Sequence, residues 1–200
     1  MRDGSELILA HAREGMEVRE RFFSESADKL DEAAYLTAKR LIRGGKVLLC
    51  GNGGSAADCQ HIAGEFVNRF LIDRPALPAL ALTTDTSVMT AIGNDSSFTQ
   101  VFARQVEAFG KKDDVLFAIT TSGNSANVLE ALRVAREKEL LTIGLTGRGG
   151  GKAAKDAVIL LAVPSDKTPI IQEVHLACEH LFCQLVDHYL FENVTALTQD

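Results

Sequence analysis

KVLLCGNGGSAA (residues 46–57) joins a short apolar run to a glycine-rich turn and the first residues of a helix. The run Val47–Cys50 has no polar side chain, as is typical of a strand covered on both faces of a sheet. Three glycines in the turn permit positive φ angles and a close backbone approach to a ligand. The stretch therefore predicts a strand–turn–helix unit in a parallel α/β sheet.

Four more apolar runs follow, with room for helices between them. They are Ala79–Leu82, Val115–Ile119, Thr142–Leu145 and Val158–Val163. Buried strands that alternate with helical stretches predict an α/β fold with a doubly wound, five-stranded parallel sheet of the flavodoxin-like kind. Ligands of such sheets bind outside the carboxyl ends of the strands.

The chain of 200 residues is expected to form one domain. Residues 1–45 are predicted to form two N-terminal helices, over Glu6–Glu25 and Asp31–Ile42, because apolar residues recur there at helical spacing. Residues 46–200 are predicted to form the α/β core. The helical arm is expected to pack against another subunit.

A long last helix is expected from Pro169 to about Tyr189. Thr168 suits its N-cap and Pro169 its first helical position. The tail after Phe191 is expected to be frayed.

Composition narrows the class of protein. The net charge is −6 and the pI about 5.4, which argues against a nucleic-acid partner, because such binding relies on Lys and Arg. No apolar run approaches the roughly 20 residues of a membrane span, and the first six residues do not resemble a signal peptide. A cytoplasmic protein without a membrane partner is expected.

The four cysteines, which lack C-x-x-C spacing, are expected to be reduced and buried: Cys50, Cys59, Cys178 and Cys183.

A second polar loop follows the third run. Residues 120–127 supply four hydroxyl side chains and a glycine, and helix capping explains one hydroxyl, most simply that of Ser125. A helix N-terminus favours an anion through its unpaired N–H groups and its dipole. The glycines of residues 51–54 match neither the dinucleotide nor the P-loop motif. The two loops therefore predict a site for a phosphate ester, whereas residues 147–152 are expected to form a flexible surface loop.

Two helices each carry a histidine and an oxygen ligand. His61 and Glu65 are spaced i,i+4, so both side chains leave one face of a helix. Gln172 and His180 lie roughly 80° apart around the last helix, so both can face one cleft. Two nitrogen and two oxygen ligands suit a tetrahedral zinc ion. The same residues could instead act as acid and base on a sugar carbon, and the spacing does not choose between these roles.

Several separated motifs together resemble the sugar isomerase (SIS) domain, and within it the family of bacterial phosphoheptose isomerases. The motifs are Gly51–Ser55, His61 with Glu65, Gly93–Asp95, Thr121–Ser125 and Ile171–His175. The resemblance covers nearly the whole chain.

The resemblance implies an aldose–ketose isomerase that converts sedoheptulose 7-phosphate to D-glycero-D-manno-heptose 7-phosphate through an enediol. That reaction leads to the ADP-heptose of the lipopolysaccharide core. The resemblance further implies a homotetramer with active sites at subunit interfaces. One zinc ion per subunit is expected, on His61, Glu65, Gln172 and His180.

Site roles follow from the same resemblance and from the chemistry of the reaction. Glu65 is the expected base at the carbon-bound proton, and His180 is the expected partner in the other proton transfers. Arg69 is expected to hold a sugar hydroxyl, with a surface ion pair as the alternative. The expected substrate contacts are Asn52, Gly53, Gly54, Ser55, Glu65, Arg69, Asn94, Asp95, Thr120, Thr121, Ser122, Ser125 and Gln172.

Two positions depart from the family pattern. Thr120 stands where a serine is frequent, which keeps the hydroxyl. Ile170 stands where an arginine is common, which removes a positive charge near the expected phosphate or subunit contact.

Two other readings compete with the enzyme. One is a non-catalytic SIS-domain protein that binds the replication initiator. It lacks the full acidic and histidine set, so Glu65 and His180 argue against it. The other is a sugar-phosphate-sensing regulator, which is expected to carry a DNA-binding extension. His175 is expected to pack within the structure, and His11 and His188 receive no role.

Overall fold

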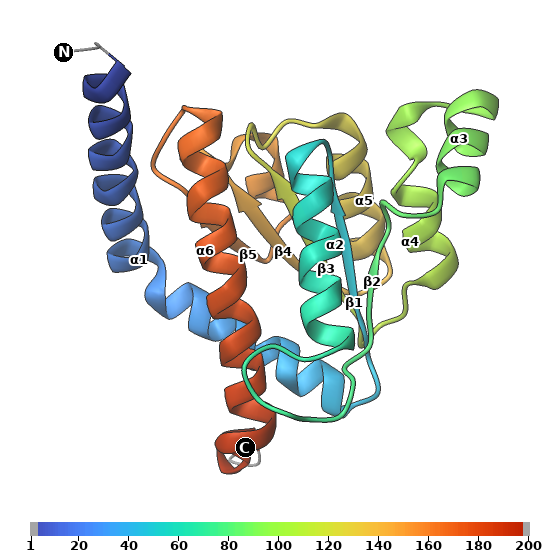
Figure 1. Cartoon of the computed structure of the whole chain (residues 1–200). Coiled ribbons are helices and arrows are strands. Elements are labelled where there is room, and N and C mark those ends of the chain that lie inside the picture. The colour runs from blue at the N-terminus through green and yellow to red at the C-terminus, as the bar shows by residue number, and fades with distance from the viewer. Residues whose placement is uncertain (1–3, 198–200) are drawn as a thin grey trace.

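The computed structural model describes residues 4–197 and shows a parallel sheet between two layers of helices (Figure 1). The strands are β1 Val47–Gly51, β2 Ala79–Ala81, β3 Val115–Thr120, β4 Leu141–Thr146 and β5 Ile159–Ala162. Their order is β2-β1-β3-β4-β5, and all pairs are parallel. The five predicted strands and the doubly wound arrangement are confirmed.

The helices divide between the two faces of the sheet. One face is covered by α1 Gly4–Ile42, α2 Gly54–Val67 and α6 Thr168–Asp187, and the other by α4 Ala103–Phe109 and α5 Ala126–Glu137. Alternate strand residues face the two cores, as Leu49 and Phe117 do on one side and Leu48 and Leu116 on the other. Burial on both faces is the reason why the strands read as unbroken apolar runs.

The N-terminal segment is one helix rather than the two predicted. Residues 26–30, between the predicted helices, continue α1, and Ser26 and Leu30 are buried there. The first part of α1 projects beside α6 and away from the sheet, with Leu7, Ile8 and Met16 more than 60% exposed (Figure 1). The prediction placed a break where helical spacing weakened, but burial of one face against the core keeps that stretch helical.

Two side-chain contacts join this arm to the start of α6. His11 Nε2 lies 2.6 Å from Glu173 Oε1, and Lys167 Nζ lies 2.7 Å from Glu14 Oε2. Ile170 is buried between these contacts, next to Gly15. The isoleucine therefore packs beneath the arm rather than facing a ligand.

The C-terminal helix begins and ends close to the predicted positions. Lys167, rather than Thr168, is its N-cap, and Pro169 lies in its first turn. The expected fraying is wrong up to Leu197, because π-helical and 3₁₀ turns continue the chain over His188–Glu192 and Val194–Leu197. There the Tyr35 hydroxyl donates to the Ala196 carbonyl at 3.4 Å. Residues 198–200, like residues 1–3, lie outside the described part of the chain.

The expected flexible loop after β4 is instead the segment η2, Arg148–Lys155, in which 3₁₀ turns are joined across Gly149, Gly150 and Gly151, all with positive φ. Its Gly150 is buried, and a side chain at Gly123 would collide with the Gly150 backbone. The Ala153 N–H donates to the Gly123 carbonyl at 3.0 Å, and the Lys152 N–H donates to Asn124 Oδ1 at 3.2 Å. The glycines of η2 therefore allow it to pack against the second polar loop.

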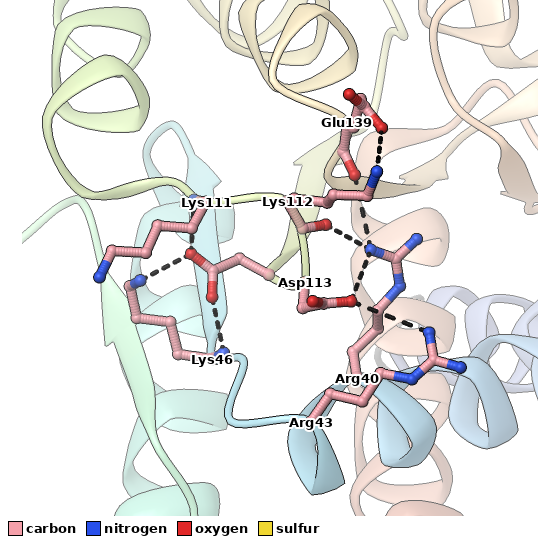
Figure 2. A network of polar contacts seen from close by, with 8 residues as sticks. Arg40, Arg43, Lys46, Lys111, Lys112, Asp113 and Glu139 are labelled. Atoms are coloured by element: carbon pink, nitrogen blue, oxygen red, sulfur yellow. Dashed lines mark hydrogen bonds and ion pairs between the residues drawn. The ribbon is translucent and has the colours of Figure 1, made fainter.

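An ion-pair network closes the amino ends of β1 and β3 (Figure 2). Lys46 donates to the buried Asp114 carboxylate from its backbone N–H at 2.9 Å and from Nζ at 2.6 Å. Arg40 donates to the Lys112 carbonyl and lies 3.7 Å from Asp113. The network joins the end of α1 to the sheet at the edge opposite the two polar loops.

Two further expectations concern cysteines and membranes. All four cysteines are free and buried, as expected. Over residues 4–197, no helix has the length and apolar character needed to cross a bilayer.

Candidate active site

The first loop leaves the start of α2 open to an anion. Gly53, with φ 58°, is the N-cap of α2, and no side chain caps the helix there. A side chain at Gly51 would press on the Ser55 backbone, so the tight turn requires glycine at that position. The free N–H groups of α2 point past the carboxyl end of β1, which is the geometry that binds phosphate.

Hydroxyl groups gather in the second loop. Thr120 Oγ1 lies 3.0 Å from Ser125 Oγ and 3.4 Å from Ser122 Oγ. Ser125 is the N-cap of α5, but its hydroxyl does not cap the helix, contrary to the prediction. The hydroxyl of Ser125 bonds to Thr120 instead, while the Val128 N–H in the first turn of α5 donates to Asn127 Oδ1 at 3.0 Å.

Two side-chain amides join the loops. Asn52 Nδ2 donates to Asn127 Oδ1 at 2.9 Å, and Asn127 Nδ2 donates to Asn52 Oδ1 at 2.8 Å. Asn52 was predicted as a site residue, whereas Asn127 was missed. Its only signal in the sequence is an amide side chain in the first turn of a helix whose next residues are apolar.

Helices α2 and α6 run side by side in the same direction (Figure 1). At their N-terminal ends, the Gln172 side chain lies so close to Gly54 that a methyl group there would collide with its amide. Further along, His61 Nε2 lies 2.9 Å from His180 Nε2. The predicted pairs therefore face each other across one line of helix contact, with Gln172 at the phosphate loop and His180 beside His61.

His61, Glu65 and His180 form the reactive cluster. Glu65 Oε1 is 3.8 Å from His61 Nε2, and its side chain is 24% exposed. The ring of Phe70 stacks on His180 with 5.6 Å between ring centroids and 18° between their planes. Both imidazoles and the carboxylate thus remain reachable while aromatic packing fixes the orientation of His180.

The donor atoms of this cluster fit a zinc ion in part. Two nitrogen ligands of a tetrahedral zinc ion lie about 3.3 Å apart, since each Zn–N bond is about 2.05 Å. The separation of 2.9 Å between the two Nε2 atoms is close to that value. Within residues 4–197, no three His, Cys, Asp or Glu side chains make up a complete metal site, and Gln172 bonds to none of the cluster.

Three predicted site residues lie apart from the cluster. Asn94 and Asp95 are exposed at the end of α3, Thr86–Asp95, where Asn94 Nδ2 donates to Asp95 Oδ1 at 2.7 Å. No hydrogen bond between described residues joins them to either loop. Arg69 is exposed and makes no ion pair with any residue in the described range, so the alternative role predicted for it is not observed.

Three titratable groups on α2 and α6 are buried or half-buried, and two of them, Glu179 and Asp58, received no role from the sequence. Burial, with a further contribution from Asp58, raises the pKa of Glu179 to about 8, and neither of its carboxylate oxygens has a hydrogen-bond partner. Burial also raises the pKa of Asp58, against the effect of His61. His175 packs within the structure as expected, and its burial lowers its pKa to about 4 despite a contact of 3.0 Å with the Thr146 carbonyl. Glu179 and His175 are therefore both mainly neutral near pH 7.

Comparisons with known proteins extend over almost the entire chain. The family model described as SIS domain matches residues 10–147. A phosphoheptose isomerase of Desulfovibrio desulfuricans is 62% identical over 192 residues, which cover 96% of this chain and 91% of that protein. The solved structure of a phosphoheptose isomerase from Neisseria gonorrhoeae is 45% identical with a TM-score of 0.86, covering 92% of this chain and 98% of that one. The structure of a phosphoheptose isomerase from Francisella tularensis has a TM-score of 0.89 at 38% identity, with the same coverage.

Proposed function

The chain belongs to the SIS domain family and, within it, to the phosphoheptose isomerases, and from this premise we propose that it interconverts sedoheptulose 7-phosphate and D-glycero-D-manno-heptose 7-phosphate. One observation carries the proposal. The amide pair of Asn52 and Asn127 joins the two polar loops. These loops lie near the N-terminal ends of α2 and α6, the helices that carry His61, Glu65 and His180. A phosphate group and the reactive end of its sugar can therefore be held at the same time.

The loops bind the phosphate end. The open N–H groups around Gly53 and Gly54 and the hydroxyls of Thr120, Ser122 and Ser125 supply donors without a buried cation. Thr121 lies in the second loop, and Ser55 is the buried second residue of α2. Because donors come from both loops, the Asn52–Asn127 pair sets the width of the phosphate site.

The cluster moves the protons. Shifting a carbonyl between C1 and C2 removes a proton from one carbon, forms an enediol and returns a proton to the neighbouring carbon. Glu65 takes and returns the carbon-bound proton, and His180 carries the proton between the two oxygens. His61 bonds to the imidazole of His180 and orients it. Gln172, whose amide lies beside Gly54, and Arg69, in the segment after α2, hold sugar oxygens.

The proposal includes one zinc ion per subunit on His61, Glu65 and His180, with Gln172 as the fourth ligand. Such an ion stabilises negative charge on the enediolate oxygen when bound. The two Nε2 atoms lie 2.9 Å apart, which supports this assignment, and zinc bound to both would replace the direct hydrogen bond between them.

We also propose that the protein is a cytoplasmic homotetramer whose active sites lie at subunit interfaces. The exposed apolar side chains Leu7, Ile8 and Met16 on α1 support association with further copies. Asn94 and Asp95 lie away from the loops of their own chain, which supports a site completed by a neighbouring subunit. Light scattering after size-exclusion chromatography tests the tetramer, and a monomer would contradict it.

The decisive experiment supplies sedoheptulose 7-phosphate to the zinc-replete protein and follows formation of the aldose. Conversion is expected, and its absence would overturn the proposed reaction. A parallel sample, stripped by chelator and checked for metal content, tests the zinc proposal separately. Full activity in that sample would remove zinc from the mechanism but leave the isomerase assignment standing.

The alternative of a non-catalytic protein that binds the replication initiator is not favoured. Glu65 and His180 are both present and lie beside the same histidine, and the relatives above are named as isomerases.

A further inference from the structure

A buried guanidinium group lies at the C-terminal end of α2, directly behind the reactive cluster. The side chain of Arg74 is only 2% exposed, and its Nε donates to Asp187 Oδ1 at 2.9 Å. Asp187 is the last residue of α6 and is itself buried. Arg74 was not predicted as a site residue, because neither its spacing nor its neighbours mark it in the sequence.

The same guanidinium group caps α2. Its Nη2 donates to the Glu65 carbonyl at 2.9 Å, and its Nη1 donates to the Phe66 carbonyl at 2.7 Å. Carbonyls in the last turn of a helix lack partners within the helix, so an outside donor fixes their position. The Glu65 carbonyl, in the backbone of the proposed base, thus accepts from Arg74, and Arg74 also pairs with Asp187 on α6.

Arg74 belongs to the segment of residues 68–78, which crosses from α2 over α6 before entering β2 (Figure 1). This segment also carries Phe70, whose ring stacks on His180. One short segment therefore contacts both proposed proton-transfer residues, through the peptide of Glu65 and through the imidazole of His180. The exposed Arg69 directly precedes Phe70 in this segment.

We propose that Arg74, paired with Asp187, is a positioning residue for the isomerase reaction. It holds the Glu65 end of α2 at a fixed distance from α6, so that the carboxylate and the imidazole of His180 meet the substrate carbons together. This inference rests on the proposed function and adds a residue that touches neither substrate nor metal. A displacement of about 1 Å at a reacting group can lower a rate roughly 100-fold, so the pair is expected to affect kcat far more than KM.

The test replaces both partners at once, in Arg74→Met/Asp187→Leu. Exchanging a buried ion pair for apolar residues of similar volume commonly preserves folding, whereas removing one partner leaves an uncompensated charge. The matched control is Arg136→Met. Arg136 also donates to a carbonyl, that of Lys155, and to a carboxylate, that of Asp156, each at 2.9 Å, but it lies on α5.

We expect the double variant to fold with a lower melting temperature, because the Glu65 and Phe66 carbonyls lose a donor, and with kcat for sedoheptulose 7-phosphate lowered at least about 10-fold and KM within about twofold. The Arg136→Met control keeps the wild-type kcat. A folded double variant with wild-type kcat would overturn the inference. If the double variant does not fold, Arg74→Lys decides by the same two kinetic criteria, since lysine keeps the charge beside Asp187 but cannot bond both carbonyls. Failure of the wild-type protein to convert the substrate would instead contradict the proposed function.

Discussion

Asn52 and Asn127 bond to each other through both halves of their amides, at 2.9 and 2.8 Å. Asn52 lies in the glycine-rich loop after β1, and Asn127 lies in the first turn of α5, after β3. These two strands are neighbours at the centre of the sheet. The pair therefore spans the point where the connections from β1 and β3 leave for opposite faces, which is where doubly wound sheets bind their ligands.

Replacing Asn127 with aspartate should weaken phosphate binding. The carboxylate cannot donate to Asn52 Oδ1, and it places a negative charge between two anion-binding loops. We expect KM to rise at least about 10-fold, the equivalent of one lost hydrogen bond to a charged group, with a smaller change in kcat. Steady-state kinetics measure both constants. Asn193→Asp, the same change in the C-terminal turns, is the control, and equal kinetics for the two variants would refute the role of the pair.

Replacing Gly54 with alanine should disable Gln172. A methyl group at this position meets the Gln172 amide, whereas α2 itself accepts alanine. We expect activity to fall at least about 10-fold with little change in melting temperature, since the collision falls on a substrate-facing side chain. Gly64→Ala provides a matched control in the same helix, because nothing lies within 4 Å of a methyl group there. That control should be neutral or stabilised by about 0.5–1 kcal/mol.

Replacing Glu65 with glutamine should abolish the proton transfer at carbon. The amide keeps the shape of the side chain but cannot act as a base, so kcat should fall by roughly 100- to 10,000-fold. Glu192→Gln is the control, because Glu192 also forms an i,i+4 pair with a histidine, His188, and lies in the C-terminal turns. Activity of Glu65→Gln within a few-fold of wild type, with the same assembly by light scattering, would exclude Glu65 as the base.

Buried Glu179 should make the protein less stable as the pH rises. Its pKa is about 8 in the folded state against 4.5 for the unfolded reference, so the folded state retains the proton longer and loses stability between these values. From pH 6.5 to 8 the loss is on the order of 1–2 kcal/mol, because the slope falls below about 1.4 kcal/mol per pH unit as the folded-state carboxyl ionises near pH 8. His175, with its pKa lowered to about 4 from 6.5, contributes a stability that is lost as the pH falls from 6.5 to 4, outside this window.

Denaturant unfolding at pH 6.5 and 8 measures the effect. Glu179→Gln should remove most of the decline, because the amide carries no proton equilibrium. Glu17→Gln, on the exposed side of α1, should retain the wild-type decline. An unchanged decline in Glu179→Gln would mean that the buried carboxyl is not its source.

The fold was largely predictable because a strand that is buried on both faces of the sheet appears in the sequence as a continuous apolar run. Runs such as Val115–Ile119 carry no polar residue, and the glycine turn after Val47–Cys50 marks where a strand becomes a helix. The break predicted within α1 was wrong because local spacing does not report burial against distant elements, as at Leu30. The turn η2 was misread for a related reason: Gly150 has no function that is visible locally and fits against Gly123 only in three dimensions.

The site was predictable where chemistry and spacing coincide. His61 with Glu65, and the hydroxyls from Thr120 to Ser125, could be recognised because reactive residue types lie a few positions apart in the sequence. Asn127 and Arg74 did not, because their partners are Asn52, Asp187 and the carbonyls of α2, which no sequence interval links to them. Side chains that only position others can be recognised once their partners in the fold are known. Side chains that perform chemistry can be recognised in part from their residue type alone.

The position of α1 in the chain determines when its buried face can pack during synthesis on the ribosome. It is synthesised first, yet its buried face packs mainly on α6, which is synthesised last. Phe22, Leu30 and Ala34 therefore leave the exit tunnel long before Val174 and Phe182 exist to cover them. The nascent chain therefore carries the buried face of α1 uncovered until α6 has been synthesised.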